Sequence, residues 1–139
     1  MSFGDAVHSV LSKYVCFTGR ARRSEYWYFI LFEMIVSAAL TGVLNFIGAR
    51  ESTVEGLTGL MSAALLLPGL GVIWRRLHDI GKSGANYFWI FVPLVGAILL
   101  LIWMCRDGDR GPNAYGPDPK DPGAGWPESG RDPWEYCWA

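Results

Sequence analysis

The residues best equipped for chemistry are gathered in one short charged segment, "RRLHDIGKSG", at positions 75–84. A histidine can exchange a proton near neutral pH and a carboxylate can orient it, so His78 and Asp79 raise the possibility of a proton relay. The two are adjacent in sequence, however, and neighbouring residues on a helix point in different directions. Arg75 and Arg76 instead suit the end of a membrane helix, where they complement the helix dipole and reach lipid phosphates. The spacing favours a structural or headgroup-binding role over a catalytic one.

Glu33 is the second candidate, because it is the ionisable residue inside a long apolar run, Tyr28 to Gly48. A carboxylate at the centre of a bilayer costs about 2.5–3.5 kcal/mol unless it is paired or neutral. Five residues of helix correspond to about 7.5 Å, so we expect Glu33 near the inner interface, paired with Arg75 or Arg76 and locking the first helix to the second. The functional alternative is a proton or solute site.

Several other classes of function are excluded by composition. Three widely separated cysteines and two histidines give no metal-ligand spacing, so neither a metal nor another cofactor is expected. A net charge of −1 leaves no basic excess with which to neutralise a run of phosphates, which excludes nucleic acid as a partner. No catalytic residue is assigned, and the chain is interpreted as a non-enzyme.

The elements that must position these residues are apolar helices. Hydrophobic residues make up 51% of the chain, and they are concentrated in three runs of about the length that a bilayer helix needs. None of the runs has the polar outer face of a helix in a soluble domain. The fold class is therefore predicted to be an all-α membrane protein, with one membrane domain over residues 1–119 and spans at about 28–48, 57–76 and 85–104.

An additional helix is predicted before the first span. Apolar residues recur there at helical spacing on one face: Phe3, Val7, Val10, Leu11 and Tyr14. Attached to a span, such a helix is expected to lie in the membrane interface, in contact with lipid. The alternative is a cap packed on the charged loop.

The distribution of Lys and Arg predicts the orientation. Cations flanking spans are retained on the cytoplasmic side. The loop between the first two spans has Arg50, whereas the other loop and the amino-terminal segment carry more: Lys13, Arg20, Arg22, Arg23, Arg75, Arg76 and Lys82. The amino terminus is predicted to be cytoplasmic and, after three spans, the carboxyl terminus periplasmic.

The carboxyl-terminal segment, residues 120–139, is predicted to be an extended tail. It is rich in Gly and Pro, which do not sustain a regular helix or sheet. Trp126, Trp134 and Trp138 are unusual in such a segment, and they indicate a surface that docks on a partner.

Three separated blocks carry a resemblance to a known family: "FTGRARRSEYWYF" (17–29), "RRLHDIGKSG" (75–84) and "GPNAYGPDP" (111–119). Together they resemble domain of unknown function 805, a family of small bacterial inner-membrane proteins. The resemblance covers about residues 3–119, and it implies a multi-pass protein of the bacterial cytoplasmic membrane with no established activity. It also implies that Arg20, Arg23, Arg75, His78 and Asp79 are recurrent positions, and that residues beyond 120 extend past the usual end.

Two classes of function remain open at this point. The first is an accessory or structural subunit that contacts lipid and docks on a larger complex of integral membrane proteins. The second is a small transporter or lipid-handling protein that uses Glu33, His78 and Asp79 as one polar site at the inner interface.

Overall fold

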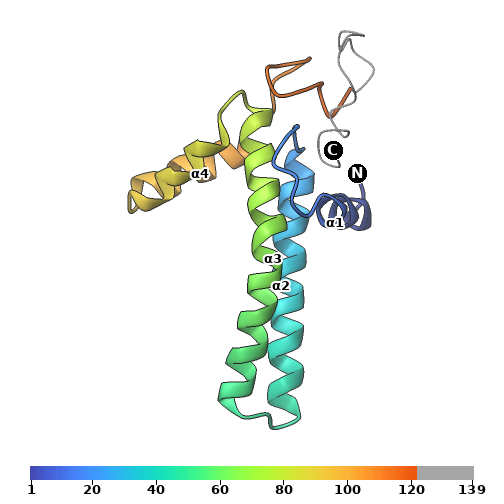
Figure 1. The fold of residues 1–139 in the computed structure, drawn as a ribbon, viewed down its shortest axis with the longest axis vertical. Helices are drawn as coiled ribbons and strands as arrows, with labels where there is room; N and C mark the ends of the chain where they lie inside the picture. The colour runs from blue at the N-terminus through green and yellow to red at the C-terminus, as the bar shows by residue number, and fades with distance from the viewer. Residues whose placement is uncertain (122–139) are drawn as a thin grey trace.

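A pair of long antiparallel helices forms the body of the protein (Figure 1). The structure, a computed structural model, describes residues 1–121, and this part of the chain contains helices and no strand beyond one isolated bridge. Helices α2 (Arg23–Phe46) and α3 (Glu51–Asp79) each have the length and apolar composition needed to cross a membrane, and α4 (Val95–Cys105) is a shorter apolar helix. The predicted all-helical class is confirmed for the described residues, and two helices of membrane-spanning length cover the first two predicted runs.

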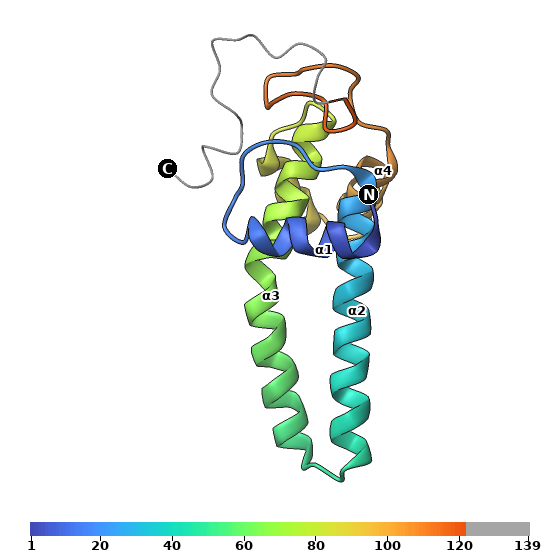
Figure 2. The same cartoon turned by 90° about the vertical axis from the view of Figure 1, so that its right-hand side faces the viewer.

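The first helix, α1 (Phe3–Ser12), lies across α2 and α3 near one end of the pair (Figure 2). It begins where the sequence supplies a capping box: Ser2 Oγ accepts from the N–H of Asp5, and the Asp5 carboxylate accepts from the N–H of Ser2. Ala6 and Val10 are the buried residues of α1, while Phe3 remains partly exposed. A helix is therefore present where one was predicted, with apolar surface left uncovered.

The third apolar run differs from its prediction. Instead of one span at 85–104, the chain forms a 3-10 helix, η1 (Gly84–Phe91), then reverses and returns as α4. Pro93 lacks an N–H and disfavours a helical conformation in the residue before it, which favours a break in the helix at this point. Leu94 completes the reversal with φ 64° and ψ −61°. We call residues 84–105 the apolar arm, and Figure 1 shows it projecting to one side of α3.

The reversal changes the side on which the following residues emerge. Met104, at the end of the arm, packs against Leu77 and Ile80 at the end of α3. Residues 106–121 therefore lie at the same end of the helix pair as the amino terminus (Figure 1). These residues lie beside the amino-terminal segment and not at the far end of the helix pair, because the arm turns back where one continuous helix was predicted. We call residues 1–25, 75–83 and 106–121 the charged end.

The residues at the end of α3 explain why the helix stops there. Gly81 has φ 69°, and its N–H donates to the carbonyl of His78. The N–H of the next residue, Lys82, donates to the carbonyl of Leu77. This pair of bonds is a Schellman motif, in which glycine accepts the left-handed conformation without strain. Ser83 then caps η1 by accepting from Ala85 N. The charged loop is therefore a helix reversal with a capping residue on each side.

The buried core is confined to the part of the molecule near the charged end. One apolar cluster joins Val10, Ala21, Phe29 and Val72. Farther along the two long helices, large apolar side chains are exposed: Met34, Val43, Phe46, Leu57, Leu60 and Leu66. Such a distribution suits a helix pair whose middle is surrounded by lipid, since exposed apolar surface of this extent is unusual in water.

Gly96 lies close to the backbone of Trp89 inside the apolar arm, so a substitution there tests the geometry of the arm directly. A Cβ added at Gly96 would overlap the backbone carbonyl of Trp89, whereas a Cβ at Gly42 in α2 would meet nothing within 4 Å. Alanine favours a helix over glycine by about 1 kcal/mol at both positions. We expect Gly42→Ala to be neutral or stabilising, and Gly96→Ala to lower the free energy of unfolding by about 1–3 kcal/mol because backbone must move. Equal effects of the two substitutions on unfolding in detergent would contradict the folded-back arm.

Candidate functional site

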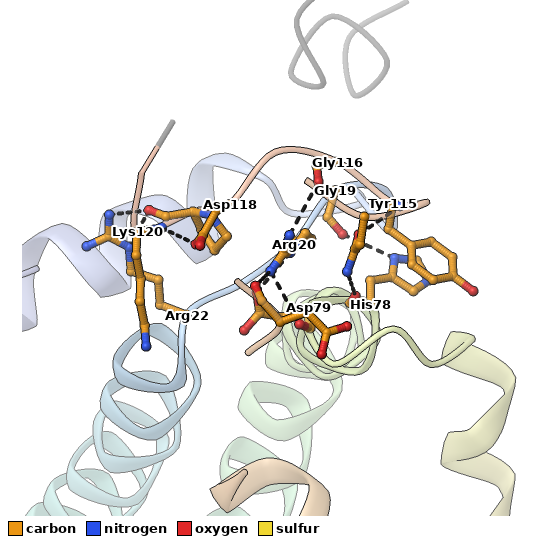
Figure 3. Close-up of polar contacts among 12 residues, drawn as sticks. Gly19, Arg20, Arg22, His78, Asp79, Tyr115, Gly116, Asp118 and Lys120 are labelled. Carbon is orange, nitrogen blue, oxygen red and sulfur yellow. Dashed lines mark hydrogen bonds and ion pairs between the residues drawn. The ribbon is translucent and has the colours of Figure 1, made fainter. Parts of the chain in front are cut away.

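Asp79 lies between two arginines at the centre of the charged end, and Figure 3 shows its contact with one of them, Arg20. Its Oδ1 accepts from Arg20 Nε at 2.9 Å and its Oδ2 from Arg76 Nη1 at 2.6 Å. The three side chains are at most 3% exposed. Arg76 is one turn before Asp79 on α3, while Arg20 comes from the segment that precedes α2. The carboxylate thus holds a distant part of the chain against the end of α3.

Arg20 also holds the carboxyl-terminal segment. Its Nη1 donates to Gly111 O at 2.6 Å and to Gly116 O at 3.4 Å, and its Nη2 donates to Asp109 O. A guanidinium has five N–H donors in a fixed plane, so one Arg20 side chain can bind a carboxylate and several carbonyls together. Arg76 adds a bond to Arg106 O. These contacts explain why residues 106–116 fold back over α3.

The His78 ring also holds the carboxyl-terminal segment against α3. It stacks on Tyr115 with ring centroids 4.0 Å apart and an interplanar angle of 4°. Its Nδ1 lies 3.1 Å from Gly19 O, which assigns the proton to Nδ1 because a carbonyl can only accept. Asn113 donates to the backbone carbonyl of His78 at 2.9 Å. His78 and Asp79 therefore have separate partners and form no proton relay with each other.

A second buried ion pair joins the three amino-terminal elements. Arg75 Nη1 donates to Glu25 Oε1 at 3.1 Å, with both side chains at most 4% exposed. Ser9 of α1 donates to the same oxygen at 3.1 Å, and Lys13 Nζ donates to Ser9 Oγ. The pair fastens α1 to the junction of α2 and α3.

Glu33 does not have the partner predicted for it. Its Oε1 would lie 3.3 Å from a Cβ added at Gly69, so Glu33 faces Gly69 on α3. Arg75 is six residues farther along, about 9 Å of helix rise, and it pairs with Glu25 instead. The predicted pairing of Glu33 with Arg75 or Arg76 is wrong, because α2 begins at Arg23 and the antiparallel register brings the earlier carboxylate opposite the arginine.

The remaining arginines of the amino-terminal segment lie nearer the surface. Arg22 donates to Pro119 O, and Arg23 pairs with Asp107 at 2.7 Å with 42% of its side chain exposed. By contrast, Arg75 and Arg76 are buried. The expectation that Arg75 and Arg76 extend to lipid phosphates therefore does not match their positions. Arg23, which the family resemblance marks as a recurrent position, is more exposed than either of them.

Asp118 orders the last described turn. Although desolvation acts to raise it, the pKa of Asp118 is lowered from its usual value, because the backbone N–H groups of Lys120 and Gly111 donate to the carboxylate. Asp118 is therefore ionised at neutral pH and draws residues 111 and 120 together.

Sequence reasoning missed the partners that complete these contacts. Glu25 and Asp118 were not singled out, although each lies in a block that carries the family resemblance. The resemblance marked Asn113 and Tyr115 as recurrent positions, but it gave no partner for either. Glu25 had an available signal, since it is the acidic residue in the first turn of α2. Among residues 1–121, no group of three or more His, Cys, Asp or Glu side chains could hold a metal ion. Trp126, Trp134 and Trp138 lie outside the described residues.

Comparison with known proteins identifies the family. The family described as "Protein of unknown function (DUF805)" matches residues 14–117. The chain belongs to this family. Inner membrane protein YhaI of Escherichia coli (strain K12) is 44% identical over 112 residues, covering 81% of this chain and 92% of that protein. Inner membrane protein YhaH of the same strain is 38% identical over 112 residues, covering 80% and 93%. No solved structure matches the chain.

The matched region contains the Asp79 ion pairs of the DUF805 chain. Arg20, Asp79 and the turn at 113–116 fall within residues 14–117, whereas α1 lies before that range. The relatives named above are inner membrane proteins, in agreement with the two apolar helices of membrane-spanning length. This chain is accordingly a membrane protein of an inner-membrane family.

Removing the central carboxylate should be far more costly than removing an exposed one. Asp79→Asn leaves Arg20 and Arg76 buried without a counter-charge, and we expect it to lower the free energy of unfolding by about 3–5 kcal/mol. Asp107→Asn removes an exposed partner of Arg23 and should cost at most about 1 kcal/mol. Unfolding of both variants in the same detergent measures the difference. Similar small losses would show that the Asp79 contacts do not hold the charged end together.

Proposed function

We propose that this chain is a non-enzymatic accessory or structural subunit that docks on a larger complex of integral membrane proteins. The observation that carries the proposal is the burial of Arg20, Arg76 and Asp79 in contacts made within the chain. Residues occupied in this way are not available to bind and turn over a substrate. A closed charged end on a pair of helices of membrane-spanning length is suited to anchoring and presenting a surface.

The proposed orientation places the charged end in the cytoplasm. Residues 1–121 contain eleven of the twelve Lys and Arg residues, because Arg131 lies beyond them. All of the eleven except Arg50 belong to the charged end, and Arg50 lies at the opposite end of the helix pair. Lys and Arg near spans are retained on the cytoplasmic side. This asymmetry supports two crossings, with the amino terminus and residues 106–121 both cytoplasmic.

The apolar arm is proposed to enter the inner leaflet without crossing the bilayer. Eight residues of 3-10 helix rise about 16 Å, and the eleven residues of α4 rise about 16.5 Å. Both lengths are about half of a 30 Å hydrocarbon core. The arm contains no charged residue, and its side chains Phe91, Leu94 and Leu101 are strongly exposed. One leaflet of lipid accounts for both its length and its composition.

The orientation can be tested by labelling single cysteines in intact bacteria with a membrane-impermeant maleimide. In a background with the three native cysteines replaced by alanine, Ser52→Cys should be labelled in intact cells because it lies at the opposite end. Lys120→Cys should react only after the inner membrane is permeabilised. Labelling of Lys120→Cys in intact cells would contradict a cytoplasmic charged end.

The docking role is tested by native mass. We propose that residues 122–139, with Trp126, Trp134 and Trp138, contribute to the docking surface. Extraction in a mild detergent should give an assembly much larger than a 15.4 kDa monomer, and this assembly should be lost when these residues are replaced by a Gly/Ser segment of equal length. The matched control replaces the three tryptophans with leucine, which keeps apolar bulk and should preserve part of the assembly. An unchanged small mass in all three samples would refute the subunit role.

The alternative of one autonomous polar site has less support. It requires Glu33, His78 and Asp79 to act together at the inner interface. His78 and Asp79 are occupied within the charged end, whereas Glu33 faces Gly69, ten residues before Asp79 along α3. A transporter or lipid-handling role would therefore have to rest on Glu33 and its own surroundings.

A further inference from the structure

A groove of about 360 Å³ runs between α2 and α3 below the charged end. Its lining includes Glu33 and Ser37 from α2, Ser62 and Gly69 from α3, and Tyr87 from η1. The remaining lining is apolar, and Met34 and Leu66 at the groove are 64% and 58% exposed. A volume in this range is sufficient for a small organic ligand, and a mostly apolar wall with a few polar groups is typical of such sites.

Gly69 provides the space in which the Glu33 carboxylate lies. A Cβ at position 69 would approach Glu33 Oε1 to 3.3 Å, closer than ordinary van der Waals contact. The carboxylate is thus directed against α3 inside the groove. Ser37 is four residues after Glu33, one helical turn away on the same face.

No charge in the described part of the chain neutralises Glu33. Among residues 1–121, the ion pairs involve Asp79, Asp107 and Glu25, and no hydrogen bond to Glu33 is formed. The cations of residues 1–121 belong to the charged end or, for Arg50, to the opposite end. A second copy of residues 1–121 therefore has no cation to bring to this depth. A carboxylate within a span is costly unless it is paired or neutral, so Glu33 in its ionised form would be stabilised by a cation that comes from outside residues 1–121.

We propose that this groove binds a monovalent lipophilic cation, an organic ammonium or phosphonium whose apolar body enters from the surrounding lipid. Glu33 supplies the counter-charge, the hydroxyls of Ser37 and Ser62 provide additional oxygen atoms, and the apolar lining contacts the body of the ligand. A single carboxylate matches one positive charge, and no cluster of metal-ligating side chains accompanies it in residues 1–121. Glu33 lies about 9 Å of helix rise beyond Arg75, so a lipid headgroup held at the interface does not reach it.

This proposal does not depend on the accessory role. A site on the isolated chain would exist whether or not a partner complex binds, and it leaves His78 and Asp79 in their structural contacts. Failure to find a partner would not affect it, and failure to find the ligand site would not affect the docking experiment.

The test compares two probes of similar shape and opposite charge, tetraphenylphosphonium and tetraphenylborate. The full chain is placed in phosphatidylcholine nanodiscs, and binding is measured by equilibrium dialysis with subtraction of empty discs. We expect saturable binding of tetraphenylphosphonium and no saturable binding of tetraphenylborate. Glu33→Gln should weaken it by about tenfold or more, since the paired charge is lost. Ser62→Leu, which fills the groove and keeps the charge, should weaken it also.

The matched control is Glu55→Gln, which removes an exposed carboxylate nearer the opposite end of α3 and should leave binding unchanged. Each variant is first shown to be monodisperse, with an unfolding transition like that of the original protein. Equal affinity of the phosphonium for the original protein and for Glu33→Gln would overturn the proposal, as would saturable binding of both probes. Absence of saturable phosphonium binding to the original protein would overturn it as well.

Discussion

The buried carboxylate of Asp79 is the constraint on which the arrangement of this protein depends. A charge removed from water must be paired and hydrogen-bonded, and Asp79 achieves this with two arginines from different parts of the chain. Arg20 can be held in place only if the segment before α2 lies against the end of α3. Its remaining N–H groups then require acceptors, which the carbonyls of residues 109, 111 and 116 provide. One buried charge therefore fixes the positions of three separate segments.

The path of the apolar arm is a consequence of the same constraint. Residues 106–116 must reach Arg20 and His78, so the preceding apolar run has to begin and end at the same end of the helix pair. Pro93 and Leu94 permit this by reversing the chain, and Gly96 permits the two halves of the arm to approach closely. Local backbone chemistry and the buried ion pairs thus favour the same fold, as expected of a sequence that specifies one structure.

The sequence predicted the features that depend on local patterns, and it failed where the outcome depends on distant contacts. The two long apolar helices are properties of short windows of residues, and both cover the predicted segments. The run at 85–104 has the composition of a span, and composition does not distinguish an arm that returns from a helix that crosses. Its Pro93 was the available sign of the break. The partner of Glu33 was misassigned because it depends on the register of α2 against α3, which periodicity within one helix does not determine.

A double-mutant cycle between Arg20 and Asp79 tests the central claim most directly. The free energy of unfolding is measured in one detergent for the original chain, Arg20→Gln, Asp79→Asn and the double variant. If the buried contact holds the segments together, the two losses should be strongly non-additive, with a coupling energy toward the upper end of the 0.5–3 kcal/mol range seen for residues in contact. Losses that add to within about 0.5 kcal/mol would show that Arg20 and Asp79 act independently and would contradict this account.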